Sequence, residues 1–153
     1  MCLAKLKTFL DNEHVKYVRI IHSPAYTAQE TAEAARLAGR EVAKTVMVKL
    51  DGQMAMAVLP GNRKVILEDL RDATGATEAK FATEKEFKDL FPGCETGAMP
   101  PFGNLFDMKV YVSAGLTEHA DIAFNAGSHA ELVKLAYKDY ERLVQPTVCR
   151  FST

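Results

Sequence analysis

The chain has 153 residues, of which 48% are hydrophobic and 25% charged, and this composition suits one globular domain over residues 1–153. The formal net charge of −1 excludes a global basic field, so any contact with nucleic acid has to be local. No apolar run is long enough to cross a membrane, and the polar N-terminus does not fit a signal peptide, so we expect a cytoplasmic protein. Cys2, Cys94 and Cys149 are odd in number and widely spaced, which predicts reduced thiols rather than disulfides or a zinc site.

The first half of the chain alternates between helix and strand patterns. It predicts an amphipathic helix, a strand, a second helix and a hairpin, in that order, at residues 1–12, 17–21, 28–39 and 44–59. Thr27 and Glu30 form a capping box at the start of the second helix. Asp51-Gly52 between two β-type runs is a strong hairpin signal.

The second half combines short helices with short strands. Helices are expected at 67–74, 84–91 and 138–144, a glycine- and proline-rich loop at 97–103, and strands at 105–106, 109–112, 122–125 and 129–135. The connections between these later strands are too short for crossover helices, so we expect antiparallel pairs. The fold class is therefore α+β, with a mixed, largely antiparallel sheet, curved or barrel-like and closed or nearly closed, surrounded by helices.

Lys44 is the first candidate for chemistry. It shares a strand face with the apolar residues Val46, Val48 and Leu50, which places its stem at the rim of the core. From there the ammonium can project into a cavity. A surface lysine that extends only to reach solvent fits the same spacing, so spacing alone leaves both interpretations open.

The segment Gly97–Gly103 is the second candidate. Pro100 and Pro101 fix φ and lack an amide hydrogen, whereas the glycines at both ends permit unusual backbone angles. Such a stiff loop presents its remaining amides at set positions, which suits the binding of a carbonyl oxygen or a ribose. A structural turn without function has the same composition.

The third candidate is Asn125–His129, which joins two predicted strands. Asparagine and glycine favour a plain hairpin turn, but Ser128 and His129 also place a hydroxyl and an imidazole at a strand end. There His129 can donate a hydrogen bond or orient a water. The other three histidines show no metal-ligand spacing, and we expect neither a metal nor a cofactor.

Common catalytic motifs are missing from the sequence. It contains no Gly-x-Ser-x-Gly, no Walker-type loop, no Gly-x-Gly-x-x-Gly and no His-Glu-x-x-His. Cys94 with His129 as its base is an alternative nucleophile, but nothing in the sequence brings the two together. We therefore expect an inert or buried thiol at Cys94.

Several segments, taken in order, resemble the YbaK family, also called the prolyl-tRNA synthetase-associated editing domain. They are His22–Thr27, Val42–Val46, Gly97–Gly103, Gly127–Leu132 and Asp139–Leu143. Together they cover about residues 15 to 145 in the family order. No synthetase domain is attached, so the resemblance is to free-standing, trans-acting members.

This resemblance implies a mixed barrel-like fold and an aminoacyl-tRNA deacylase. Such an enzyme hydrolyses the ester that joins a small noncognate amino acid to the terminal adenosine of a tRNA, here on tRNA-Pro. The catalytic residues implied by the family pattern are Lys44, Gly97 and His129. The implied substrate-binding residues are His22, Tyr26, Thr27, Thr45, Ala98, Met99, Pro100, Pro101, Phe102, Gly103 and Ser128.

Two departures from the family pattern concern the amino acid. Gly97-Ala98 and Pro100-Pro101 stand where cysteinyl-tRNA editors carry two glycines and Ser-Pro, and Thr45 stands where some alanyl-tRNA editors carry Asn. Alanine, serine, threonine and cysteine therefore all stay open. The expected partner is the single-stranded CCA end of an aminoacyl-tRNA, with a transient synthetase contact left open. The alternative function is a non-catalytic aminoacyl- or nucleotide-binding module on the same fold.

Overall fold

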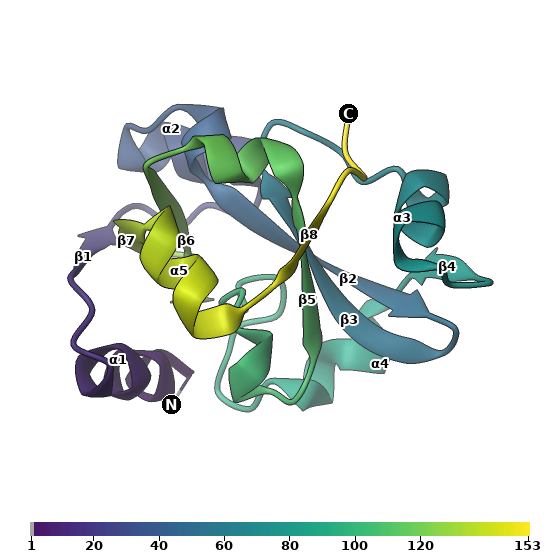
Figure 1. The fold of residues 1–153 in the computed structure, drawn as a ribbon. Coiled ribbons are helices and arrows are strands. Elements are labelled where there is room, and N and C mark those ends of the chain that lie inside the picture. The colour runs from purple at the N-terminus through teal and green to yellow at the C-terminus, as the bar shows by residue number, and fades with distance from the viewer. Residues whose placement is uncertain (1) are drawn as a thin grey trace.

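The computed structural model describes residues 2–153, and Figure 1 shows its helices packed around two β-sheets. The α-helices are α1 (Cys2–Asn12), α2 (Ala28–Ala35), α3 (Leu67–Thr74), α4 (Glu84–Phe87) and α5 (Tyr137–Val144). The strands are β1 (Tyr17–Ile21), β2 (Ala43–Leu50), β3 (Gln53–Pro60), β4 (Ala79–Phe81), β5 (Lys109–Ser113), β6 (Asp121–Ser128), β7 (Glu131–Ala136) and β8 (Thr147–Cys149). Short 3-10 turns form η1 (Gly39–Glu41), η2 (Lys88–Leu90), η3 (Gly103–Leu105) and η4 (Ala114–Glu118).

The strands form one antiparallel and one mixed sheet. The smaller sheet has the order β1-β7-β6, and the larger has the order β4-β2-β3-β5-β8. The β2–β3 hairpin turns at Asp51-Gly52, and β5 adds to β3 in parallel. A single parallel bridge between Val42 and Ala123 connects the two sheets. This bridge brings the beginning of β2 beside β6, so residues about 80 positions apart in the chain become neighbours.

The apolar core has two parts. The larger cluster contains residues from both sheets, together with Leu6 and Leu10 of α1 and Tyr140 of α5. The smaller cluster contains Leu70 of α3 and Phe151, packed against the other face of β2 and β3. Strand β3 is thus buried on both faces, which fixes the hairpin that carries Lys44.

The predicted α+β class and most predicted elements are confirmed. Thr27 caps α2 as expected, with both hydrogen bonds of the capping box to Glu30 present. The helix ends at Ala35 rather than near Gly39, because Arg36 adopts the left-handed conformation at φ 59° and ends the helical backbone. The hairpin at Asp51-Gly52 is confirmed.

Three predictions about the sheet are wrong. Residues 105–106 form no strand, because the Gly103 carbonyl accepts hydrogen bonds from the amides of Phe106 and Met108 and the chain turns there. The sheet is not closed, since the strands divide into two sheets. The prediction of antiparallel pairs among the later strands is confirmed for β6 and β7 but is wrong for β5, which pairs in parallel with β3 and with β8, a strand that was not predicted.

The prediction of three reduced thiols is also wrong. Cys2 at the start of α1 and Cys94 form a disulfide, with Cα atoms 5.0 Å apart. The 92-residue separation hides this proximity in the sequence, whereas docking of Leu6 and Leu10 in the core carries Cys2 to the loop. Gly127 makes room for the pair, because a Cβ there would lie 2.6 Å from the Cys2 sulfur. Cys149 keeps a free thiol, and burial raises its pKa.

Candidate functional site

A small polar cavity opens where β2 and β6 meet, close to the bridge between the sheets. We call it the lysine cavity, and its volume is about 170 Å³. It is lined by Tyr26, Ala28, Val42, Ala43, Lys44, Thr45, Gly97, Met99 and Asn125. This volume is below the range of about 300–1,000 Å³ that is usual for small-molecule pockets, so the cavity suits a small chemical group.

Lys44 supplies the positive charge of this cavity. Its side chain is half-buried at the second position of β2, and it forms no salt bridge within residues 2–153. Burial lowers the pKa of the Lys44 ammonium, and the nearby charge of Lys64 lowers it further. Lys49, on the same strand, instead forms a salt bridge with Glu86. An ammonium without a carboxylate partner is ready to bind an anionic or carbonyl oxygen.

Asn125 is a cavity residue that the sequence analysis placed at the end of a predicted strand and the start of a turn, but not in the site. It lies in β6 rather than in a turn, and it lines the cavity opposite β2. Its Oδ1 is buried and has no hydrogen-bond partner within the described chain. A buried amide oxygen without a partner costs free energy, so a bound group that donates a hydrogen bond to it would be stabilised. A register prediction for β6 would have been needed to find it.

The segment that contains Gly97 and Met99 forms one wall of the cavity. Two hydrogen bonds fix this wall to β6, from Glu95 N to Gly127 O and from Gly127 N to Ala98 O, each 2.8 Å long. Gly97 adopts φ +88°, and its amide donates to the Met99 sulfur at 3.2 Å. Because a thioether is a weak acceptor, this amide is available to a stronger one, such as a carbonyl oxygen.

The rest of the predicted loop lies in the core rather than at the cavity. Residues Ala98 to Gly103 are buried, and only Met99 among them reaches the cavity lining. The Phe102 ring packs on Phe9, Phe124 and Tyr140. The Tyr140 hydroxyl donates a 2.7 Å hydrogen bond to the Pro101 carbonyl. Pro100–Gly103 therefore anchors the loop, and Gly97–Met99 faces the site.

His129 does not line the cavity but contacts residues that do. Its Nε2 is 2.9 Å from the Thr96 carbonyl, and since a carbonyl only accepts, this nitrogen carries the proton. Its Nδ1 is buried without a partner, and its amide donates to Glu95 at 2.8 Å. The His129 ring centroid is 4.8 Å from that of Tyr26, which does line the cavity. His129 thus lies against two residues of the cavity, Tyr26 and Gly97.

The remaining candidate residues surround this arrangement without lining the cavity. The His22 ring contacts the carbonyl of Ser23, and the His22 amide donates to Ala130. Thr27 caps α2, and Ser128 accepts a hydrogen bond from the Ala130 amide. The structure therefore brings five of the predicted residues together at the cavity, namely Tyr26, Lys44, Thr45, Gly97 and Met99.

Cys94 offers no nucleophile to this site. Its sulfur is bonded to Cys2, so the alternative pair of Cys94 and His129 lacks the thiolate that it requires.

Within residues 2–153, no helix has both the length and the apolar character to span a bilayer.

Comparison with known proteins decides the family. The model of the aminoacyl-tRNA editing domain matches residues 22–143, most of the chain, including every residue of the lysine cavity. The chain belongs to this family. The editing domain is also 30% identical over 152 residues to the multifunctional Ser/Thr-tRNA deacylase ProXp-y of Escherichia coli, an alignment that covers 96% of this chain and 90% of the relative.

Two further proteins extend the comparison. The editing domain is 26% identical over 142 residues to the prolyl-tRNA editing protein ProX of Acetoanaerobium sticklandii, which covers 89% of this chain and 86% of that protein. The fold is shared with a crystal structure described as a candidate trans-editing enzyme for prolyl tRNA synthetase. That match has a TM-score of 0.82 at 20% identity and covers 99% of this chain and 97% of the other.

Proposed function

We propose that this editing domain, as residues 1–153, hydrolyses the ester of a mischarged aminoacyl-tRNA that carries a small amino acid. The observation that carries the proposal is the lysine cavity itself. An unpaired ammonium, a buried amide oxygen and a weakly bonded backbone amide, from Lys44, Asn125 and Gly97, surround a space of about 170 Å³. The family supports the same reaction, as do the names of two relatives, one a Ser/Thr-tRNA deacylase and the other a prolyl-tRNA editing protein.

The chemistry requires little beyond positioning. An aminoacyl ester is already activated, so a water that attacks its carbonyl carbon releases the free amino acid and the ribose hydroxyl. The Gly97 amide is placed to donate to the oxygen that gains negative charge, and the Lys44 ammonium adds electrostatic stabilisation. No side-chain nucleophile is needed, in agreement with the bonded state of Cys94.

Selection follows from the size of the cavity. A cavity of about 170 Å³ accepts a small side chain and excludes a large one, which is the second sieve of an editing system. The Asn125 oxygen can accept a hydrogen bond from a substrate hydroxyl or ammonium group. Because one curated relative is named as a Ser/Thr-tRNA deacylase, serine and threonine are the first amino acids to test, before alanine and cysteine.

The partner in this proposal is the single-stranded CCA end of a tRNA, presented either free or during a transient contact with a synthetase. Tyr26 is 73% exposed at the cavity, so its ring offers a face on which the terminal base can stack. With a tRNA substrate, the protein is expected to act in the cytoplasm. There the Cys2–Cys94 disulfide is exposed to a reducing thiol pool.

A panel of mischarged tRNAs tests the proposal. Seryl-, threonyl-, alanyl- and cysteinyl-tRNA are incubated with the protein, and release of the amino acid is followed against correctly charged prolyl-tRNA. We expect rapid cleavage of at least one small aminoacyl ester and none of the prolyl ester. Tight binding without cleavage of any ester would replace the hydrolase with the non-catalytic binding module.

A further inference from the structure

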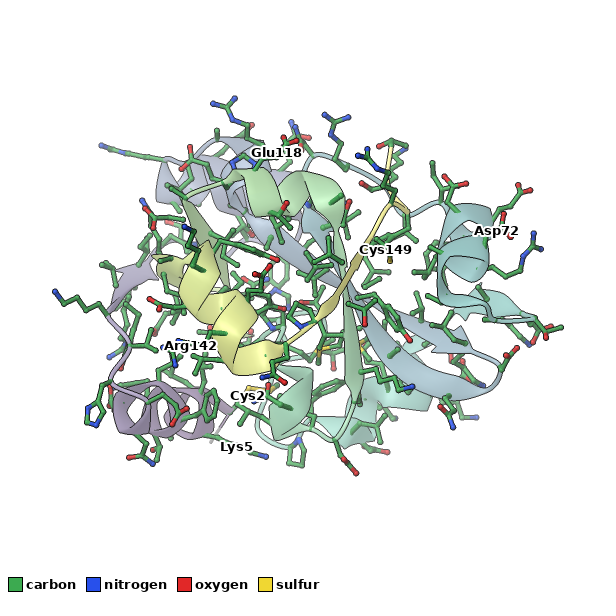
Figure 2. All side chains as sticks on the ribbon, viewed as in Figure 1. Cys2, Lys5, Asp72, Glu118, Arg142 and Cys149 are labelled. Atoms are coloured by element: carbon green, nitrogen blue, oxygen red, sulfur yellow. A yellow bond between two sulfur atoms is a disulfide. The ribbon has the colours of Figure 1, made fainter. Side chains whose placement is uncertain are left out.

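A larger depression lies beside the lysine cavity and carries a concentrated positive charge. We call it the arginine cleft, and its volume is about 420 Å³. Three guanidinium groups line it, from Arg40 in η1, Arg63 after β3 and Arg150 after β8. One carboxylate side chain, that of Glu118 in η4, faces them, and Figure 2 shows Glu118 at the end of the molecule where the chain terminates in Figure 1.

Two of these three arginines, Arg40 and Arg150, have no ion-pair partner among residues 2–153. Arg63 donates a 3.0 Å hydrogen bond to the main-chain oxygen of Thr153. The chain as a whole has a net charge of −1, so this positive charge is local. Exposed guanidinium groups around a polar cleft match the geometry and charge of phosphate oxygens.

The cleft and the lysine cavity share a wall. Pro60 and Asn62 line the cleft, and Gly61 lies between them. The Gly61 amide donates a 2.6 Å hydrogen bond to the carbonyl of Val42, which lines the lysine cavity. A Cβ on Gly61 would lie only 3.0 Å from that carbonyl, so the two depressions are one backbone layer apart. The cleft is therefore a basic depression that this backbone contact connects to the lysine cavity.

We infer that the arginine cleft binds the phosphodiester groups of the RNA strand that leads to the terminal adenosine, while the lysine cavity holds the ester. This inference rests on the proposed function. The nearby charge of Lys64, in the loop that also carries Arg63, continues the positive surface towards Lys44. An RNA end can therefore be bound by a local cluster of positive charge. No basic face over the whole protein is needed, in agreement with the net charge of −1.

The test compares two esters of the same amino acid. One is seryl- or threonyl-tRNA, and the other is the corresponding ester of adenosine, which lacks phosphates. In the double variant Arg40→Ala/Arg150→Ala, KM for the tRNA ester is expected to rise by about tenfold or more relative to KM for the adenosine ester, because charge-assisted hydrogen bonds to phosphate are lost. The slope of log affinity against log salt is expected to become shallower by about 1.4, since two phosphate contacts are lost and each single-strand contact contributes about 0.7.

Two further variants sharpen the outcome. Arg142→Ala removes an exposed arginine on α5, paired with Asp139 and remote from Glu118 in Figure 2, and is expected to leave the tRNA kinetics unchanged. Glu118→Gln removes the facing carboxylate and is expected to lower KM for the tRNA ester. An equal rise in KM for both esters, or an unchanged salt dependence in the double variant, would contradict the binding of phosphates in the cleft.

Failure of the proposed function would be recognisable separately. If the wild-type protein cleaves neither ester, binding of an uncharged RNA that ends in CCA still tests the cleft by fluorescence anisotropy. Weaker RNA binding by the double variant than by Arg142→Ala would then show that the arginine cleft binds RNA, even though the protein is not a hydrolase. Equal binding by both variants would overturn it.

Discussion

The two halves of the glycine- and proline-rich loop perform different tasks. Gly97–Met99 contributes two residues to the wall of the lysine cavity, with a backbone amide bonded only to a sulfur. Pro100–Gly103 is buried, and its Phe102 ring contacts three aromatic rings. The anchored half holds the facing half at fixed positions, so rigidity at the site comes from side chains that never reach it.

Truncation of the anchored half is expected to have the largest effect on stability. Phe102→Ala removes a fully buried ring, and the free energy of unfolding should fall by about 3–5 kcal/mol because a cavity remains. Urea denaturation measures this loss, with Leu90→Ala, an exposed position, as the control. An unchanged stability combined with a raised KM would show that Phe102 belongs to the site. That result would contradict the assignment of Pro100–Gly103 to an anchoring role alone.

Loss of the disulfide is expected to loosen the facing half. Cys94 lies three residues before Gly97, and the bond to Cys2 closes a span of 92 residues. Reduction should lower the free energy of unfolding by about 2–4 kcal/mol, because the unfolded chain gains conformational freedom. Denaturation with and without dithiothreitol measures this change, and Cys149→Ala serves as the control with the bond intact. Alkylation of three thiols in the unreduced protein would contradict the pairing.

Substitution in the facing half is expected to affect activity more than stability. Gly97 has φ +88°, so Gly97→Ala should cost about 1–3 kcal/mol of backbone strain. Its new methyl group would also lie 3.5 Å from the His129 ring, beside the cavity. Gly52→Ala is the matched control, because Gly52 has φ +82° and open space around it. Deacylation should fall only in Gly97→Ala, and equal activity in both variants would remove Gly97 from the site.

The smallest expected effect concerns the charge of Lys64, which acts on Lys44 in the same cavity as Gly97–Met99. Lys64→Gln should raise the pKa of the Lys44 ammonium, although burial, the larger cause, still holds this pKa below its ordinary value of 10.5. Because the unfolded chain binds this proton more tightly, the stability contributed by Lys44 rises with pH between the lowered and the ordinary pKa. Removal of Lys64 should weaken that rise. An NMR titration of Lys44, with Lys80→Gln as control, measures the shift, and an unmoved titration would contradict the coupling.

The sequence alone predicted those features that depend on neighbours in the chain. The capping box of Thr27 and Glu30, the Asp51-Gly52 hairpin and the alternation that places Lys44 at a rim are all local patterns. The alternation in β2 sets the face of each side chain before any tertiary contact forms. The resemblance to the family then indicated which of these local motifs belong to one site.

Long-range packing determined what the sequence could not predict. The Cys2–Cys94 bond depends on how α1 docks, and the parallel pairing of β3 with β5 depends on a connection of almost 50 residues. Asn125 looked like a turn residue, and only the register of β6 shows that its amide faces the lysine cavity. Local composition carries no information on these contacts, because they join segments far apart in the chain.

The central claim is that the unpaired ammonium of Lys44 makes the cavity a deacylation site. The most direct measurement compares kcat/KM for a mischarged tRNA in Lys44→Ala and in Lys49→Ala, two lysines of one strand of which only Lys44 lines the cavity. We predict a loss of about 100-fold or more in Lys44→Ala with the fold intact by circular dichroism, because electrostatic stabilisation of the reacting ester is lost, and retained activity in Lys49→Ala. Equal activity in the two variants would contradict the account.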